Sequence, residues 1–174
     1  MAVLSVRRYG DPVLRRKAES VSAITPEIKE LIADMVDTMY HQVGIGIAAP
    51  QIGISLRVVV LDTEQGTSPR ALVNPAITGE GGRMEAEEGC LSLPGIFAMV
   101  ERAEWVEVQA QDADGQPVKL EARGLLARVV QHELDHLDGI LFIDWLDKAT
   151  RDRIKRKIKK EGLPDEAPHP AFAL

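Results

Sequence analysis

Two histidines four positions apart stand in the run Gln131-His132-Glu133-Leu134-Asp135-His136. In a helix, four positions advance the chain by about 6 Å and return to nearly the same face, so both imidazoles can point at one metal ion. Glu133 then lies roughly 100° further around the helix, where its carboxylate can act as a general base toward water. This is the H-E-x-x-H pattern of metal-dependent hydrolases. The pattern therefore predicts a metal site with His132 and His136 as two ligands.

A catalytic metal usually has three protein ligands and one open position, so a third ligand must come from elsewhere in the chain. The metzincin pattern would place it at position 142, but Phe142 cannot bind a metal, which excludes that class. A thermolysin-like glutamate would have to be Glu161, in a basic run near the chain end, which is a poor candidate. Cys90 is the only cysteine and the better candidate, because a thiolate is a strong ligand for borderline metals. The alternative for Cys90 alone is a buried, inert thiol.

The elements that must position these residues follow from the spacing of apolar residues. A helix is expected over 125–138, ended by Gly139, and an N-terminal helix from the Thr25 cap to about Val43-Gly44. Strands are expected at 57–62, 71–74, 105–111 and 117–122, and glycine and proline interrupt the strand pattern at 87–95, around Cys90. The pattern predicts an α+β fold in which antiparallel sheets pack around a central helix carrying the H-E-L-D-H motif, with an N-terminal helix and a basic C-terminal helix.

Length and composition indicate one globular domain. The chain has 174 residues, 45% of them hydrophobic, and a formal net charge of −6. No apolar run approaches the roughly 18 to 20 residues that span a bilayer, and the N-terminal apolar segment is too short for a secretory signal. We therefore expect a cytoplasmic protein without a membrane segment, with residues 1–162 as one catalytic domain and 163–174 as a mobile tail.

Charge is distributed unevenly along the chain. Residues 147–162 hold eight Lys and Arg against three Asp and Glu, so they carry +5 and leave −11 on the rest. A basic helix of this kind suggests a polyanionic partner, or simply a well-solvated helix face.

Three stretches together resemble, in order and separation, the signature motifs of peptide deformylases: Gly44-Ile-Gly-Ile-Ala-Ala-Pro-Gln51, Glu88-Gly-Cys-Leu-Ser92 and Gln131-His-Glu-Leu-Asp-His136. The similarity extends from the N-terminus to about Gly162. It implies that the metal ligands are Cys90, His132 and His136, with Glu133 as general base and acid. It also implies that Gln51 and the backbone N–H of Leu91 stabilise an oxyanion, and that Gly46 lines the site through its backbone.

The resemblance implies removal of the N-formyl group from the formyl-methionine of newly synthesised polypeptides, with release of formate. The expected metal is Fe²⁺, with Zn²⁺, Ni²⁺ or Co²⁺ able to replace it. An ion pair of Glu88 with Arg102 is expected to orient the cysteine loop. The methionine side chain would contact a pocket wall formed by Ile45, Leu125 and Val129. The alternative role of these three residues is core packing.

One departure from the family pattern is Gly95-Ile-Phe-Ala-Met99, where many relatives have more polar residues, so substrate contacts at the site entrance stay open. The basic helix 147–162 resembles a family helix that docks on the ribosome in some bacterial members. The expected partners are thus formyl-methionyl nascent peptides and the ribosome, with no membrane and no direct DNA binding.

Two other readings stay open. An H-E-x-x-H peptidase would not need Cys90. A non-enzymatic metal domain or ribosome-associated module would tolerate Glu133→Gln.

Overall fold

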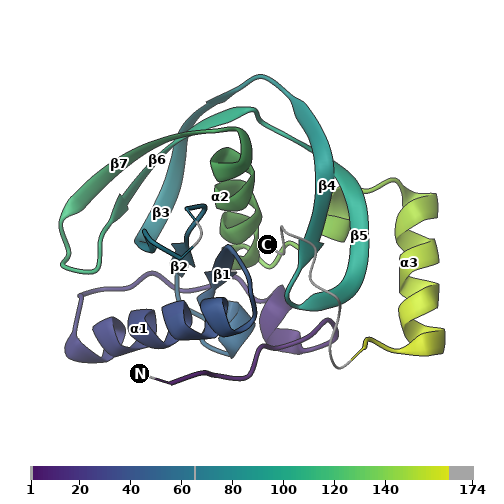
Figure 1. Cartoon of the computed structure of the whole chain (residues 1–174), viewed down its shortest axis with the longest axis horizontal. Helices are drawn as coiled ribbons and strands as arrows, with labels where there is room; N and C mark the ends of the chain where they lie inside the picture. The colour runs from purple at the N-terminus through teal and green to yellow at the C-terminus, as the bar shows by residue number, and fades with distance from the viewer. Residues whose placement is uncertain (1, 65, 165–174) are drawn as a thin grey trace.

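Helix α2 (Gly124–Leu137) lies at the centre of the computed structural model, which describes residues 2–64 and 66–164 (Figure 1). A five-stranded sheet and helix α1 lie on one side of it, and the hairpin of β4 and β5 lies on the other. The predicted α+β arrangement around the motif-bearing helix is confirmed. Of the predicted mobile tail, residues 165–174 lie outside the described part of the chain.

The larger sheet has the strand order β1-β2-β3-β6-β7, and each neighbouring pair is antiparallel. Its strands are β1 Gly46–Ala48, β2 Val58–Leu61, β3 Arg70–Gly81, β6 Trp105–Gln111 and β7 Pro117–Arg123. All four residues of β2 are buried, since successive side chains point to opposite faces of a strand and both faces are covered. Val59 and Leu61 pack in the cluster that includes α2, whereas Val58 and Val60 pack in the cluster that includes α1.

The smaller sheet is the hairpin of β4 (Met84–Cys90) and β5 (Leu93–Arg102). The expected interruption of the strand pattern at 87–95 was wrong, because the two strands continue to Cys90 and from Leu93. Gly89 has a packing reason instead: a Cβ there would lie 2.5 Å from the ring of its cross-strand partner Phe97. The cysteine therefore stands at the end of a paired strand, directly before a tight turn.

Helix α1 (Pro26–His41) begins where the sequence predicted, since the Thr25 hydroxyl accepts a hydrogen bond from Ile28 N. Helix α2 ends before Gly139, whose φ is +74° and whose missing side chain leaves room for the Arg15 carbonyl. Helix α3 (Lys148–Glu161) buries Ile154 in the cluster that also contains Cys90.

Three short 3₁₀ turns complete the elements, η1 Pro12–Arg15, η2 Ala49–Ile52 and η3 Phe142–Trp145. Among the described helices, none is both long and apolar enough to cross a membrane.

Candidate metal centre

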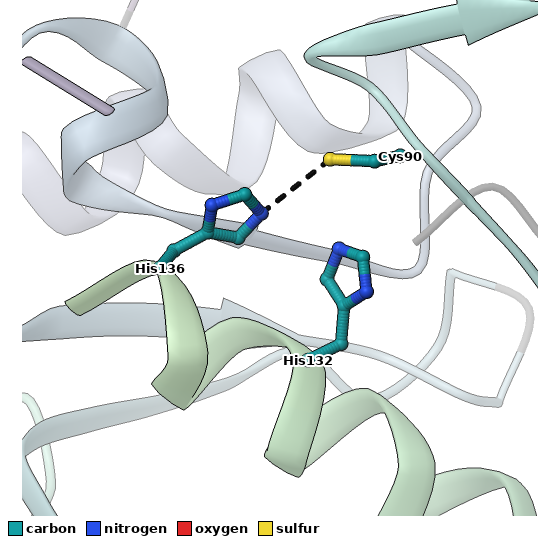
Figure 2. Close-up of side chains that lie close together, drawn as sticks. All are labelled: Cys90, His132 and His136. Atoms are coloured by element: carbon teal, nitrogen blue, oxygen red, sulfur yellow. Dashed lines mark hydrogen bonds between the residues drawn. The ribbon is translucent and has the colours of Figure 1, made fainter. Parts of the chain in front are cut away.

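Three metal-ligating side chains from two elements meet beside α2. Cys90 ends β4, while His132 and His136 lie one turn apart on the same helix face, and Figure 2 shows their side chains directed toward one another. Their donor atoms all lie within 4.8 Å of one another, and Cys90 Sγ is 3.4 Å from His136 Nε2. Each of the three residues is at least 96% buried. The structure thus brings together the ligand set that the sequence predicted.

The contacts of His132 fit a bound metal. Its Nδ1 lies 2.9 Å from Glu88 Oε1, an arrangement that directs the other ring nitrogen toward the centre. That nitrogen, Nε2, is buried and has no hydrogen-bond partner among the described residues. Because buried polar atoms are almost always paired, this one is available as a ligand atom. One thiolate and two imidazoles suit Fe²⁺, Zn²⁺, Ni²⁺ or Co²⁺, so the residues fit a borderline divalent ion.

The buried groups around the centre shift the pKa values of the two histidines in opposite directions. Burial alone would lower the pKa of His132, but Cys90 and Glu88 raise it to about 10. Burial and the neighbouring imidazole of His132 lower the pKa of His136 well below its usual value. Burial would raise the pKa of Glu88, yet hydrogen bonds from Arg102 and His132 lower it, so this carboxylate is ionised. An ionised carboxylate therefore lies directly behind His132, where it can compensate positive charge at the centre.

Glu133 lies next to this centre, with its Oε1 3.9 Å from His136 Nε2. Its side chain is fully buried, and neither carboxylate oxygen has a hydrogen-bond partner in the described chain. Burial raises the pKa of Glu133 to about 7, against the opposing attraction of His132. A carboxyl group whose pKa is near neutrality can both accept and return a proton at physiological pH.

Gly46 in β1 makes room for that carboxylate. A Cβ at position 46 would lie 2.7 Å from Glu133 Oε2 and 2.9 Å from Val129 Cγ1. Backbone therefore approaches the carboxylate as closely as a residue without a side chain permits. The lining role of Gly46 toward a substrate stays a prediction.

Gln51 is held by two contacts that fix the orientation of its amide. Its Oε1 accepts a hydrogen bond of 2.9 Å from Ala48 N, and its Nε2 donates one of 3.1 Å to Ser92 Oγ. The same nitrogen is 3.7 Å from Cys90 Sγ. Leu91 is buried in the turn that follows Cys90. Both predicted oxyanion donors thus belong to segments that contact the cysteine.

The three residues predicted to line a methionine pocket differ in exposure. Val129 is fully buried, and Ile45 packs partly buried against the same cluster. Leu125 is 37% exposed, one turn before Val129 on α2. Its side chain is thus accessible, whereas Val129 also belongs to the core.

A network of charged residues behind His132 extends what the sequence predicted. The expected pair is present, since Arg102 donates to both oxygens of Glu88 at 2.7 and 2.9 Å. Arg102 also pairs at 2.7 Å with Asp135, whose Oδ2 accepts a hydrogen bond of 2.8 Å from the indole of Trp145.

Arg128, which was not predicted from the sequence, lies 2.5 Å from Glu88 Oε2 and is 97% buried. One signal could have found it. Arg128 is a charged residue in an otherwise apolar run, four positions before His132 and therefore on its helix face.

Phe142 stands where a metzincin would have its third metal ligand. In this structure it packs against the site. Its ring is stacked on that of His132, with centroids 6.1 Å apart and planes 26° apart. The apolar ring covers the imidazole and is fully buried itself.

Comparison with known proteins agrees with this geometry. The chain matches the family model described as polypeptide deformylase over residues 3–152. A peptide deformylase of Thermodesulfovibrio yellowstonii is 47% identical over 162 residues, which cover 91% of this chain and 98% of the relative. One of Nitrosococcus oceani is 48% identical over 161 residues, which cover 92% and 96%.

Solved structures of peptide deformylases also match the fold of this chain. A peptide deformylase from Legionella pneumophila has a TM-score of 0.87 at 43% identity and covers 91% of this chain and 95% of its own. One from Ehrlichia chaffeensis in complex with actinonin has a TM-score of 0.87 at 35% identity, with coverage of 92% and 99%. These matches confirm the resemblance that the three sequence motifs indicated.

Proposed function

The chain belongs to the polypeptide deformylase family, and we propose that Cys90, His132 and His136 hold the divalent metal on which its activity depends. The enzyme hydrolyses the N-formyl group from the formyl-methionine of newly synthesised polypeptides and releases formate. The observation that carries the proposal is the convergence of one thiol and two imidazoles in a buried place, beside a carboxylate that has no hydrogen-bond partner among the described residues.

The bound ion would polarise the formyl carbonyl and lower the pKa of a water molecule beside it. We propose Fe²⁺ as the native metal, with Zn²⁺, Ni²⁺ or Co²⁺ able to replace it. At equal availability the Irving–Williams order would favour Zn²⁺ over Fe²⁺, so the metal loaded depends on supply. Metal analysis of protein purified without oxygen tests this, and a chain loaded with zinc alone would contradict it.

Glu133 moves the proton in the proposed reaction. It takes a proton from the attacking water and passes it to the amine nitrogen as the C–N bond breaks, so that formate and a free N-terminus leave. Its pKa of about 7 supports both transfers, because the group spends comparable time with and without the proton near neutral pH. Burial of the carboxylate keeps bulk water from supplying that proton instead.

Gln51 and Leu91 stabilise the negative charge that forms on the formyl oxygen. The amide nitrogen of Gln51 donates to Ser92 Oγ at 3.1 Å and more weakly to Cys90 Sγ at 3.7 Å, and the hydrogen on the sulfur side is the proposed donor to the oxyanion. The backbone N–H of Leu91 is proposed as the other donor. Gly46 supplies backbone along the substrate, and the methionine side chain contacts Ile45, Leu125 and Val129.

One assay separates this proposal from the other readings. Formate release from formyl-Met-Ala-Ser and cleavage of an internal peptide bond are measured for wild type, Cys90→Ala and Glu133→Gln. We expect formate release that Cys90→Ala abolishes and Glu133→Gln reduces by about 10² to 10⁴. Cleavage that survives Cys90→Ala would favour a peptidase, and unchanged function of Glu133→Gln would favour a non-enzymatic domain.

Residues 1–162 form the proposed catalytic domain, which acts in the bacterial cytoplasm, where formylated nascent chains arise.

Helix α3 is the proposed ribosome contact, because it buries little besides Ile154. It exposes seven basic side chains, Lys148, Arg153, Lys155, Arg156, Lys157, Lys159 and Lys160.

Charge reversal on α3 tests the ribosome contact without removing the buried Ile154. A variant with Lys155, Arg156, Lys159 and Lys160 changed to Glu is compared with wild type for co-sedimentation with ribosomes and for hydrolysis of a free formyl peptide. We expect loss of co-sedimentation with peptide hydrolysis unchanged, and equal co-sedimentation would remove the proposal.

A further inference from the structure

The three proposed ligands come from two elements that no backbone ladder joins. Cys90 belongs to the β4–β5 hairpin, which forms a sheet of its own, while both histidines belong to α2. In a continuous sheet, backbone hydrogen bonds would fix the distance between ligands. Here side-chain contacts between the hairpin and the helix must fix the distance between Cys90 and the two histidines.

Glu88 is where these contacts meet. It lies two positions before Cys90 on β4, where the strand pairing is irregular between Gly89 and Cys90, and both side chains are buried. Its fully buried carboxylate has three partners, and one of them, Arg102, lies on β5 of the same hairpin. Only the other two partners connect Glu88 directly to α2, namely His132 and Arg128.

Arg128 binds both strands of the hairpin at once. Its Nη1 donates to Glu88 Oε2 at 2.5 Å and to the carbonyl of Val100 on β5 at 2.8 Å. Its Nη2 donates to the carbonyl of Met84 on β4 at 2.6 Å. A guanidinium suits this arrangement, because its donors point in fixed and separate directions.

The position of Arg128 on α2 links this clamp to the metal site. Arg128 precedes His132 by one helical turn, and the two side chains reach opposite oxygens of the same carboxylate. Displacement of the hairpin relative to α2 would therefore break the Arg128 contacts and change the separation of Cys90 from the histidines. A second tie, from Arg102 to Asp135 at 2.7 Å, lies nearer the end of the helix and touches no strand carbonyl.

We propose that Arg128 is a positioning residue that holds the cysteine-bearing hairpin in register with the two histidines and so slows the loss of the metal. The inference rests on the ligand assignment proposed above. It adds a residue that touches neither substrate nor metal and acts through Glu88 and the two strands.

The test uses the full chain loaded with Co²⁺, whose absorption includes a band from thiolate bonding. Arg128→Met keeps an unbranched, uncharged stem in place of the guanidinium and removes all three contacts. We expect its Co²⁺ to be lost to excess EDTA faster than in wild type by about 10- to 100-fold, with a weakened or shifted thiolate band. Arg128→Lys keeps the charge but cannot bind all three acceptors at once, so we expect an intermediate rate of metal loss.

Arg57→Met is the matched control. Arg57 also joins another segment to α2, through a 3.0 Å hydrogen bond to the carbonyl of Leu137 and a 3.1 Å ion pair with Asp138. It makes no contact with Glu88, so we expect a lowered melting temperature with the wild-type rate of metal loss and the wild-type Co²⁺ spectrum.

The outcomes separate positioning from stability alone. Faster metal loss and an altered thiolate band in Arg128→Met, with neither in Arg57→Met, support the inference. Wild-type rates in both Arg128 variants, or equal acceleration in Arg57→Met, would overturn it. If Arg128→Met does not fold, Arg128→Lys decides by the same two readouts. Absence of the thiolate band from the wild-type enzyme would instead overturn the assignment of Cys90 as a ligand.

Discussion

The close approach of backbone to carboxylate at Gly46 gives a sharp test of the proposed proton carrier. A Cβ at position 46 would lie 2.7 Å from Glu133 Oε2, so Gly46→Ala must displace that side chain. Misplacement of a reacting group by about 1 Å can cost roughly 10²-fold in rate, and we expect kcat for formate release to fall by that order. The same Cβ would lie 2.9 Å from Val129 Cγ1 in the core, so we also expect a lower melting temperature, and kcat is measured well below it.

Gly79→Ala serves as the control for this variant. Gly79 also lies in a strand of the larger sheet, and the nearest atom to a Cβ there is 3.6 Å away, which is an ordinary contact. Equal losses of kcat in the two variants would show that crowding of Glu133 is not the cause.

At the scale of elements, an unfavourable residue, Val43, follows the C-terminal end of helix α1. Gly44 N donates to the Met39 carbonyl and Val43 N to the Tyr40 carbonyl, which places Val43 at the position where helices prefer glycine in a left-handed conformation. Val43 has φ +56° and is 63% exposed, so its β-branched side chain brings strain and little burial.

We therefore expect Val43→Gly to stabilise the fold by about 1 kcal/mol, which raises the melting temperature by about 2 to 4 °C in a chain of this size. Thermal unfolding followed by circular dichroism measures the change. A lowered melting temperature would mean that the valine side chain contributes packing that outweighs its backbone strain.

Helices α1 and α2 and strand β6 illustrate what the sequence could predict. Capping residues and apolar spacing predicted the start of α1, the whole of β6 and the ends of α2 closely, because those signals act within one turn or one strand. The pair of histidines followed from helix geometry, and Cys90 from counting the ligands that a catalytic metal needs.

The parts that the sequence did not predict depend on contacts between distant segments. In the sequence alone, Gly89 indicates an interruption of the strand. Its packing role becomes clear only because Phe97 is its partner across the hairpin. Arg128 meets Glu88 across 40 positions, and no local periodicity encodes such a contact.

At the scale of the whole molecule, one hydrogen bond gives stability a defined dependence on pH. Tyr40 on α1 donates to Asp62 Oδ2 at 2.6 Å, just past the end of β2. Burial and this bond raise the pKa of Tyr40 to about 12. Burial would raise the pKa of Asp62, but the bonds from Tyr40 and from the backbone of Glu64 lower it on balance.

The signs of the two shifts define the range in which the bond stabilises the fold. Asp62 contributes stability above its unfolded pKa of about 3.9, which is lost as the pH falls through the lowered folded value. Tyr40 contributes stability below its unfolded pKa of about 10, which is lost as the pH rises toward 12.

Tyr40→Phe should therefore lower the free energy of unfolding by about 1 kcal/mol between roughly pH 5 and 9. The difference from wild type should shrink at both ends of this range. Urea unfolding of both proteins at a series of pH values checks this, and a difference that stays constant from pH 3 to 11 would contradict it.

The indole of Trp145 makes the buried ion network optically accessible. Its ring is 57% exposed, yet its N–H is bonded to Asp135, which pairs with Arg102, which in turn holds the carboxylate behind His132. Trp105, the other tryptophan of the chain, lies under the guanidinium of Arg123, whose Cζ is 6.0 Å from the ring centroid. The protein thus carries its own fluorophore at the outer end of the contacts that orient a metal ligand, and emission from Trp145 offers a label-free view of that buried network in solution.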